Sequence, residues 1–139
     1  MVYVFDTSFI AALIIPDERA PHSDKMYTRI KNEDEKYTPQ LLWYEITNLF
    51  KNLIVRKRYT ADEISHFFLP LAAIGLKTDF ETGTGYSQKI FDLCNNYKLT
   101  SYDAAYLELA ERKKAVLCTL DRNLKSAAKK HGVKVLNGI

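Results

Sequence analysis

The sequence predicts an α/β fold in which a mostly parallel sheet carries helices on both faces. Short apolar segments rich in β-branched and aromatic residues alternate with longer segments of helical periodicity. The clearest of them, residues 2–5, is apolar throughout, which is typical of a strand covered on both faces. At 139 residues the chain has room for one substantial core, so we expect a single domain spanning residues 1–139.

The elements follow from these apolar runs and from capping patterns at their ends. The expected strands cover residues 2–5, 36–38, 74–78, 115–120 and 133–136. The expected helices cover residues 7–15, 19–31, 39–58, 60–73, 83–97, 102–113 and 122–131. Pro39 suits a helix start, Thr60 and Glu63 form a capping-box pattern, Ser101 is the expected N-cap of helix 102–113, and Gly132 closes helix 122–131.

Composition excludes several classes of protein. The chain is 47% hydrophobic and 27% charged, which is typical of a globular protein rather than a disordered one. A net charge of +3 permits a polyanionic partner, although many ordinary proteins share this balance. No signal peptide or apolar run of transmembrane length is found, and Cys94 and Cys118 lie in apolar stretches. We therefore expect a cytoplasmic protein with reduced cysteines and no membrane partner. The three histidines are too scattered for a zinc site.

Four carboxylates occupy positions where a structural role is hard to explain. Asp6 and Asp121 each follow an apolar strand and precede a helix, at the strand ends where α/β sheets place their ligands. Glu45 shares a helical stripe with Leu41, Leu42 and Leu49, and Asp103 shares one with Tyr106, Leu107 and Ala110. Either of these two acids, taken alone, is equally well explained as a complement to its helix dipole. The helix dipole does not explain all four acids together.

If the fold gathers these acids, a cation is the simplest compensation for their repulsion. Two carboxylates about 4 Å apart repel by roughly 4 kcal/mol at an effective dielectric near 20. Ligation by oxygen alone suits Mg²⁺ or Mn²⁺. A water bound to such an ion can be activated as a nucleophile while the ion neutralises phosphate charge. The pattern therefore indicates metal-assisted phosphodiester hydrolysis, with Asp6, Glu45, Asp103 and Asp121 as catalytic residues and metal ligands.

The order and surroundings of these acids resemble the PIN-domain ribonucleases, and most closely the VapC toxins of toxin–antitoxin pairs. The resemblance rests on Asp6-Thr7-Ser8, Tyr44-Glu45-Ile46, Tyr102-Asp103-Ala104-Ala105 and Thr119-Leu120-Asp121. It implies a three-layer PIN-like fold with a parallel sheet of about five strands. It also implies Mg²⁺- or Mn²⁺-dependent cleavage of single-stranded RNA, a homodimer and an antitoxin partner. The family's hydroxyl-bearing supporting residues fall on Ser8 and Thr119, with Thr7 as a further candidate.

Three more features bear on the substrate or on the metal. Arg122, next to Asp121, is a candidate for holding the scissile phosphate. Many relatives carry a further acid two residues after the last one, where this chain has Asn123, so the number of tightly held ions stays open. Basic residues at 51–58 and 125–130 could follow an RNA backbone, although such runs are more often solvated helix faces.

Rival functions fit the sequence less well. An aspartate-based phosphatase would need a second aspartate where Ser8 stands, and a receiver domain would need adjacent acids after residue 5. The remaining alternative is a non-catalytic RNA-binding or assembly domain that keeps the nuclease fold. Loss of one of the four acids would favour it, and none is lost. Aromatic residues at 43–68 exceed what a core needs, which predicts at least one exposed ring for a partner, either an antitoxin helix or a second subunit.

Overall fold

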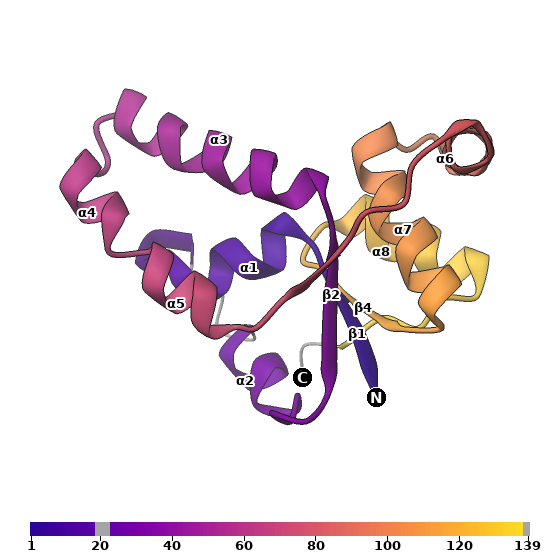
Figure 1. Ribbon diagram of the computed structural model, residues 1–139, viewed down its shortest axis with the longest axis horizontal. Coiled ribbons are helices and arrows are strands. Elements are labelled where there is room, and N and C mark those ends of the chain that lie inside the picture. The colour runs from indigo at the N-terminus through magenta and orange to yellow at the C-terminus, as the bar shows by residue number, and fades with distance from the viewer. Residues whose placement is uncertain (19–22, 138–139) are drawn as a thin grey trace.

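The computed structural model describes residues 1–18 and 23–137, and a parallel sheet with the strand order β3-β2-β1-β4 runs through its centre. The strands are β1 (Val2–Phe5), β2 (Glu35–Pro39), β3 (Lys77–Asp79) and β4 (Val116–Cys118). Every neighbouring pair in the sheet is parallel. Figure 1 shows the sheet nearly edge-on, with helices on either side. The predicted α/β class is confirmed.

The helices form two layers. On one side of the sheet lie α1 (Thr7–Ile14), the short 3₁₀ turn η1 (Pro16–Glu18), α2 (Ser23–Thr28), α3 (Leu41–Val55), α4 (Ala61–Ser65) and α5 (Phe68–Ala73). On the other side lie α6 (Thr84–Tyr97), α7 (Ser101–Lys113) and α8 (Arg122–His131) (Figure 1). None of these helices has the length and apolar character needed to cross a membrane.

The last predicted strand is reduced to one bridge. Val135 bridges Leu117 of β4 in the parallel sense, and the Leu136 N–H donates to the Leu117 carbonyl over 2.9 Å. The described part of the chain therefore has a sheet of four strands, where about five were expected. One physical reason lies at the end of α8: the Val133 N–H donates to the Ala128 carbonyl over 2.9 Å, which leaves only residues 134–136 of the predicted strand to pair with β4.

Two helix predictions need correction. The segment 60–73 is two helices, α4 and α5, rather than one, although the capping box of Thr60 and Glu63 is present. Pro70 explains the break, because in a continuous helix its ring would clash with the carbonyl of His66. Pro39 ends β2 and does not begin a helix, and α3 starts at Leu41.

Smaller differences affect the ends of four elements. The N-cap of α7 is Thr100 and not Ser101, which becomes the first helical residue. Helix α3 ends at Val55, before the predicted 58, and β3 starts at Lys77, later than the predicted 74. Of the helix predicted over 19–31, residues 19–22 lie outside the described residues. Residues 23–28 form the short α2, which ends before the predicted 31.

The core lies between the sheet and helices α1 and α7. The rings of Phe5 in β1 and Phe9 in α1 pack edge to face with centroids 4.9 Å apart. All residues from Ala104 to Ala110 of α7 are buried, so this helix is covered on nearly every side. Cys118 is buried in the core as expected, whereas Cys94 is only half-buried at its edge.

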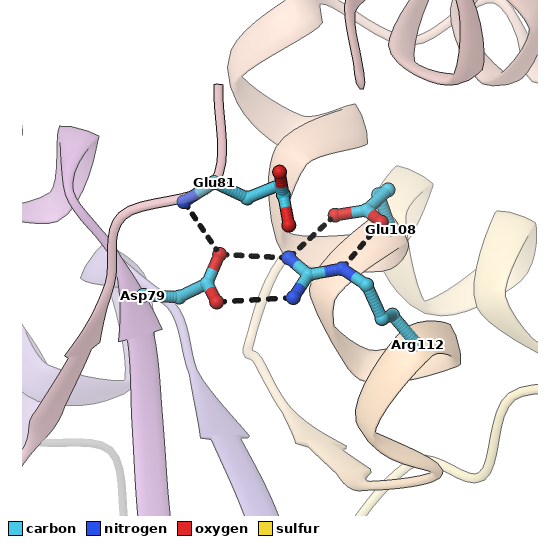
Figure 2. A network of polar contacts seen from close by, with 4 residues as sticks. All are labelled: Asp79, Glu81, Glu108 and Arg112. Carbon is cyan, nitrogen blue, oxygen red and sulfur yellow. Dashed lines mark hydrogen bonds and ion pairs between the residues drawn. The ribbon is translucent and has the colours of Figure 1, made fainter. Parts of the chain in front are cut away.

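A partly buried ion-pair network anchors α7 to the sheet (Figure 2). The Arg112 guanidinium donates to both carboxylate oxygens of Asp79, over 3.0 and 2.7 Å, and to Glu108 over 2.8 and 3.1 Å. Asp79 ends β3 and also accepts the Glu81 N–H, while Arg112 and Glu108 lie one turn apart on α7. The network thus fixes the helix that carries Asp103 and Tyr106.

Candidate active site

The carboxyl ends of β1 and β4 lie side by side and bring together residues far apart in the sequence. Phe5 of β1 is paired with Cys118 of β4, and the Asp6 N–H donates to the Cys118 carbonyl over 3.2 Å. The residues that follow, Asp6 and Thr119, are therefore neighbours. Parallel α/β sheets place their ligand sites at this end.

Asp6 is a buried carboxylate held by hydroxyl and amide donors. Its side chain caps α1: Oδ1 accepts the Phe9 N–H over 3.0 Å and the Ser8 hydroxyl over 2.7 Å. Its other oxygen, Oδ2, accepts the Thr119 hydroxyl. Burial, together with a smaller contribution from the negative charge of Asp103, raises the pKa of Asp6 to about 6 against the opposing effect of these hydrogen bonds.

Ser8 and Thr119 have further contacts that hold them in place. Their hydroxyl oxygens are 3.3 Å apart. The Ser8 hydroxyl accepts the Leu120 N–H over 2.9 Å, and the Thr119 hydroxyl accepts the Asp121 N–H over 3.0 Å. The two residues expected to support the site thus link Asp6 directly to the backbone that carries Asp121.

Asp103 and Asp121 stand at the first turns of two helices. Asp121 is the N-cap of α8, and its Oδ1 accepts the Leu124 N–H over 2.8 Å. Asp103 is the third residue of α7 and is half-buried. Burial raises the pKa of Asp103, and the charges of Asp121 and Glu45 raise it further. Asp103 therefore lies within the electrostatic field of both of these acids.

Glu45 reaches this region from α3 and is bound by two hydroxyl groups. Its Oε1 accepts the Tyr106 hydroxyl over 2.6 Å and the Thr7 hydroxyl over 2.9 Å. Burial, followed by the bond to Glu45, raises the pKa of Tyr106 far above its usual range, so the phenol stays protonated. Sequence reasoning placed Tyr106 only on the buried stripe of its helix. The available signal was its position one turn after Asp103 on that stripe.

The two buried carboxylates among the described residues make an instructive contrast. Glu108 is 3% exposed and has the guanidinium of Arg112 as its partner. Asp6 is 5% exposed, yet no basic side chain within residues 1–18 and 23–137 forms an ion pair with it, nor with Glu45, Asp103 or Asp121. A buried charge is costly without a partner. Within the described residues, these four carboxylates therefore have no basic side chain as an ion-pair partner.

The donor set fits a hard divalent cation that keeps part of its water shell. All the donors are oxygens, which suits Mg²⁺ or Mn²⁺. Within the described residues no group of three acidic, histidine or cysteine side chains lies close enough together to hold a metal ion directly. Mg²⁺ does not require such a group, because it usually binds one or two carboxylates directly and reaches others through water.

The basic candidates differ in their availability. Arg122 is exposed at the start of α8, next to Asp121, and forms no ion pair within the part of the chain that the structure describes. Arg58 is engaged elsewhere, since it pairs with Asp17 over 3.0 Å and with Glu18 over 3.3 Å. Arg122 is thus the better placed of the two to meet a phosphate at the carboxylates.

Comparison with known families agrees with this geometry. A family model described as the PIN domain matches residues 3–130 of the chain. The match includes all four acids and, apart from Val2, all four strands of the parallel sheet. The chain therefore belongs to the PIN-domain family.

Individual relatives place it more narrowly, with the VapC type. Ribonuclease VapC3 of Pyrobaculum aerophilum is 32% identical over 124 residues, which cover 89% of this chain and 92% of VapC3. The crystal structure of PAE2754 from Pyrobaculum aerophilum has a TM-score of 0.68 at 26% identity and covers 98% of this chain and 92% of its own. A toxin–antitoxin complex from Klebsiella pneumoniae shares the fold, with a TM-score of 0.63 at 18% identity over 99% of this chain and 98% of that one.

Proposed function

We propose that this VapC-type PIN protein is a metal-dependent endoribonuclease and the toxin of a toxin–antitoxin pair. The observation that carries the proposal is the buried Asp6 carboxylate at the joined ends of β1 and β4. The negative charge of Asp103 repels the Asp6 carboxylate, and within the described residues no basic side chain forms an ion pair with Asp6. Such a site gains most from a bound divalent ion. Similarity to ribonuclease VapC3 over 89% of the chain supports RNA as the substrate.

Each side chain has a separate task in this mechanism. Mg²⁺ or Mn²⁺, when bound, supplies an activated water and neutralises charge on the phosphate. Asp6, Asp103 and Asp121 would hold the ion, directly or through water, and Glu45 would complete the site and orient the attacking water. Ser8 and Thr119 keep the Asp6 carboxylate in place through the hydrogen bonds described above.

Arg122 would bind the phosphate from outside the acidic cluster. Arg122 is the exposed first residue of α8 and directly follows Asp121, and within the described residues it forms no ion pair with Asp6. Guanidinium groups suit phosphate because they offer paired donors in one plane. This division of roles leaves the metal to act on the scissile bond and Arg122 to position the strand.

The partner is an antitoxin, and we propose that a homodimer presents the site. The relative from Klebsiella pneumoniae was crystallised as a toxin–antitoxin complex. In this chain Phe68 is 50% exposed and Leu69 is 79% exposed on α5, whereas Phe50 and Phe67 are buried. These two residues of α5 are the exposed apolar surface that an antitoxin helix or second subunit would cover. A basic antitoxin side chain reaching Asp6 or Asp121 would displace the metal.

The alternative, a non-catalytic domain, is tested by the same experiment as the nuclease. Purified protein is incubated with unpaired RNA in chelator, in Mg²⁺ and in Mn²⁺. The proposal expects cleavage only in the two metal-containing reactions. Cleavage in chelator would overturn the metal requirement, and RNA binding without cleavage in every condition would favour the non-catalytic domain.

A further inference from the structure

Three oxygen atoms from three helices meet beside the acidic cluster. The Tyr106 hydroxyl of α7 is 2.6 Å from Oε1 of Glu45 in α3. The Thr7 hydroxyl of α1 is 2.9 Å from the same Oε1 and 3.0 Å from the Tyr106 oxygen. The contact therefore joins helices from both layers of the fold at one carboxylate oxygen.

Counting protons fixes the direction of the shortest bond. The two hydroxyls carry one proton each, and an ionised carboxylate can only accept. If Tyr106 donated to Thr7, its 2.6 Å contact with Glu45 would bring two oxygens together without a proton between them. Tyr106 therefore donates to Glu45. The Thr7 proton is then free to reach Oε1 as a second donor.

The arrangement treats the two oxygens of Glu45 differently. Oε1 faces both hydroxyl donors, while Oε2 accepts from no donor within residues 1–18 and 23–137. The Tyr106 ring is 2% exposed, so its hydroxyl is held firmly by the packing of α7. Asp103 lies one turn before Tyr106 on that helix. A single rigid helix thus carries one candidate metal ligand and the donor that orients another.

We propose that Tyr106 is a positioning residue of the nuclease site, which holds Oε1 of Glu45 so that Oε2 is presented to the metal ion or its water. The inference rests on the proposed function. Groups that orient metal ligands through hydrogen bonds typically change metal affinity or activity about 10- to 100-fold when removed. Thr7 is the second donor to the same oxygen.

The test is Mn²⁺ binding by titration calorimetry without RNA, together with RNA cleavage rates. Tyr106→Phe keeps the ring and removes only the hydroxyl. We expect the Mn²⁺ dissociation constant to rise, and the rate to fall, about 10- to 100-fold. Tyr97→Phe is the matched control, because it loses a 2.8 Å bond to His131 away from the acids. The control should bind Mn²⁺ and cut RNA as the wild type does.

A double variant separates positioning from a general loss of structure. In a Glu45→Gln background the further change Tyr106→Phe should alter Mn²⁺ affinity less than twofold, because the oxygen on which it acts has lost its role. Thr7→Val removes the other donor without touching the core ring and should weaken Mn²⁺ binding in the same direction. It also keeps the test valid if Tyr106→Phe fails to fold.

The outcomes distinguish this inference from the proposed function. Wild-type Mn²⁺ binding with an unchanged dissociation constant in both Tyr106→Phe and Thr7→Val would overturn the positioning role and leave the nuclease intact. Fully additive losses in the double variant would also overturn it. Absence of Mn²⁺ binding by the wild type would refute the proposed function itself, and the positioning role with it.

Discussion

Thr119 donates a hydrogen bond to Asp6 across a separation of 113 residues in the sequence. The contact exists because β1 and β4 are adjacent and end at the same level, with Phe5 paired to Cys118. Ser8 donates to the other oxygen of Asp6, so the carboxylate is bound on both sides. These donors stabilise the ionised form only in part, since burial still raises the pKa of Asp6 to about 6.

Metal-free protein should lose stability as the pH rises from about 4 to about 6. The pKa of Asp6 is raised from 3.8 to about 6, so the folded chain holds its proton over a range in which the unfolded chain has released it. The free energy of unfolding should therefore fall by up to about 3 kcal/mol from this group. Denaturant titrations in chelator, wild type against Asp6→Asn, measure it. A stability difference between the two proteins that is constant across this range would argue against the raised pKa.

Divalent metal should stabilise the wild type at neutral pH. An ion that binds only the folded state adds about 2.7 kcal/mol at a concentration 100 times its dissociation constant. Neutralising one acid relieves repulsion, so Asp6→Asn should be more stable than wild type in chelator and gain less from Mg²⁺ or Mn²⁺. Melting curves in the three conditions test both statements. Wild-type midpoints that do not differ would be incompatible with a shared metal site.

Thr119→Val should reduce both stability and RNA cleavage. It removes the donor to Asp6 and the acceptor of the Asp121 N–H, which costs about 1–3 kcal/mol for a buried group left without its partner. Thr38→Val is a matched control, because Thr38 is equally buried but donates to the Phe5 carbonyl. The control should lose stability and keep its cleavage rate per folded molecule. An equal loss of cleavage rate in Thr119→Val and Thr38→Val would contradict a role of Thr119 in the active site.

Leu69→Lys should weaken binding of the partner without unfolding the chain. Leu69 is 79% exposed on α5, so a charge there costs little in the free protein and much in a covered interface. Phe80→Lys, at a side chain 68% exposed after β3, is the control. Light scattering gives the mass of the chain alone, and calorimetry gives antitoxin affinity. A wild-type monomer whose antitoxin affinity is unaffected by Leu69→Lys would rule out α5 as the interface.

The fold class and the strand ends were readable from the sequence because they depend on local patterns. An apolar run followed by an acid and a helix placed Asp6 and Asp121 at one edge of a parallel sheet. The break between α4 and α5 was missed, although Pro70 was a local signal for it, since a proline disfavours a continuous helix through this position. The N-cap of α7 was misplaced because Thr100 and Ser101 are adjacent residues of similar capping ability.

What the sequence did not reveal depends on packing between distant elements. The bond from Tyr106 to Glu45 requires α3 and α7 to approach at one point, which no periodicity within either helix specifies. The pairing of Arg112 with Asp79 is of the same kind. The last predicted strand is reduced to one bridge for a related reason, since the N–H of its first residue, Val133, donates to Ala128 and closes α8.

RNA cleavage by Asp6→Asn tests the central claim most directly. The variant keeps the shape and the capping ability of residue 6 but loses one ligand charge, so it should fold normally and cleave RNA at least about 100-fold more slowly than wild type in Mn²⁺. Because the acids act as one unit, adding Asp103→Asn should reduce the rate little further. Cleavage by purified Asp6→Asn at close to the wild-type rate would contradict the account of the site.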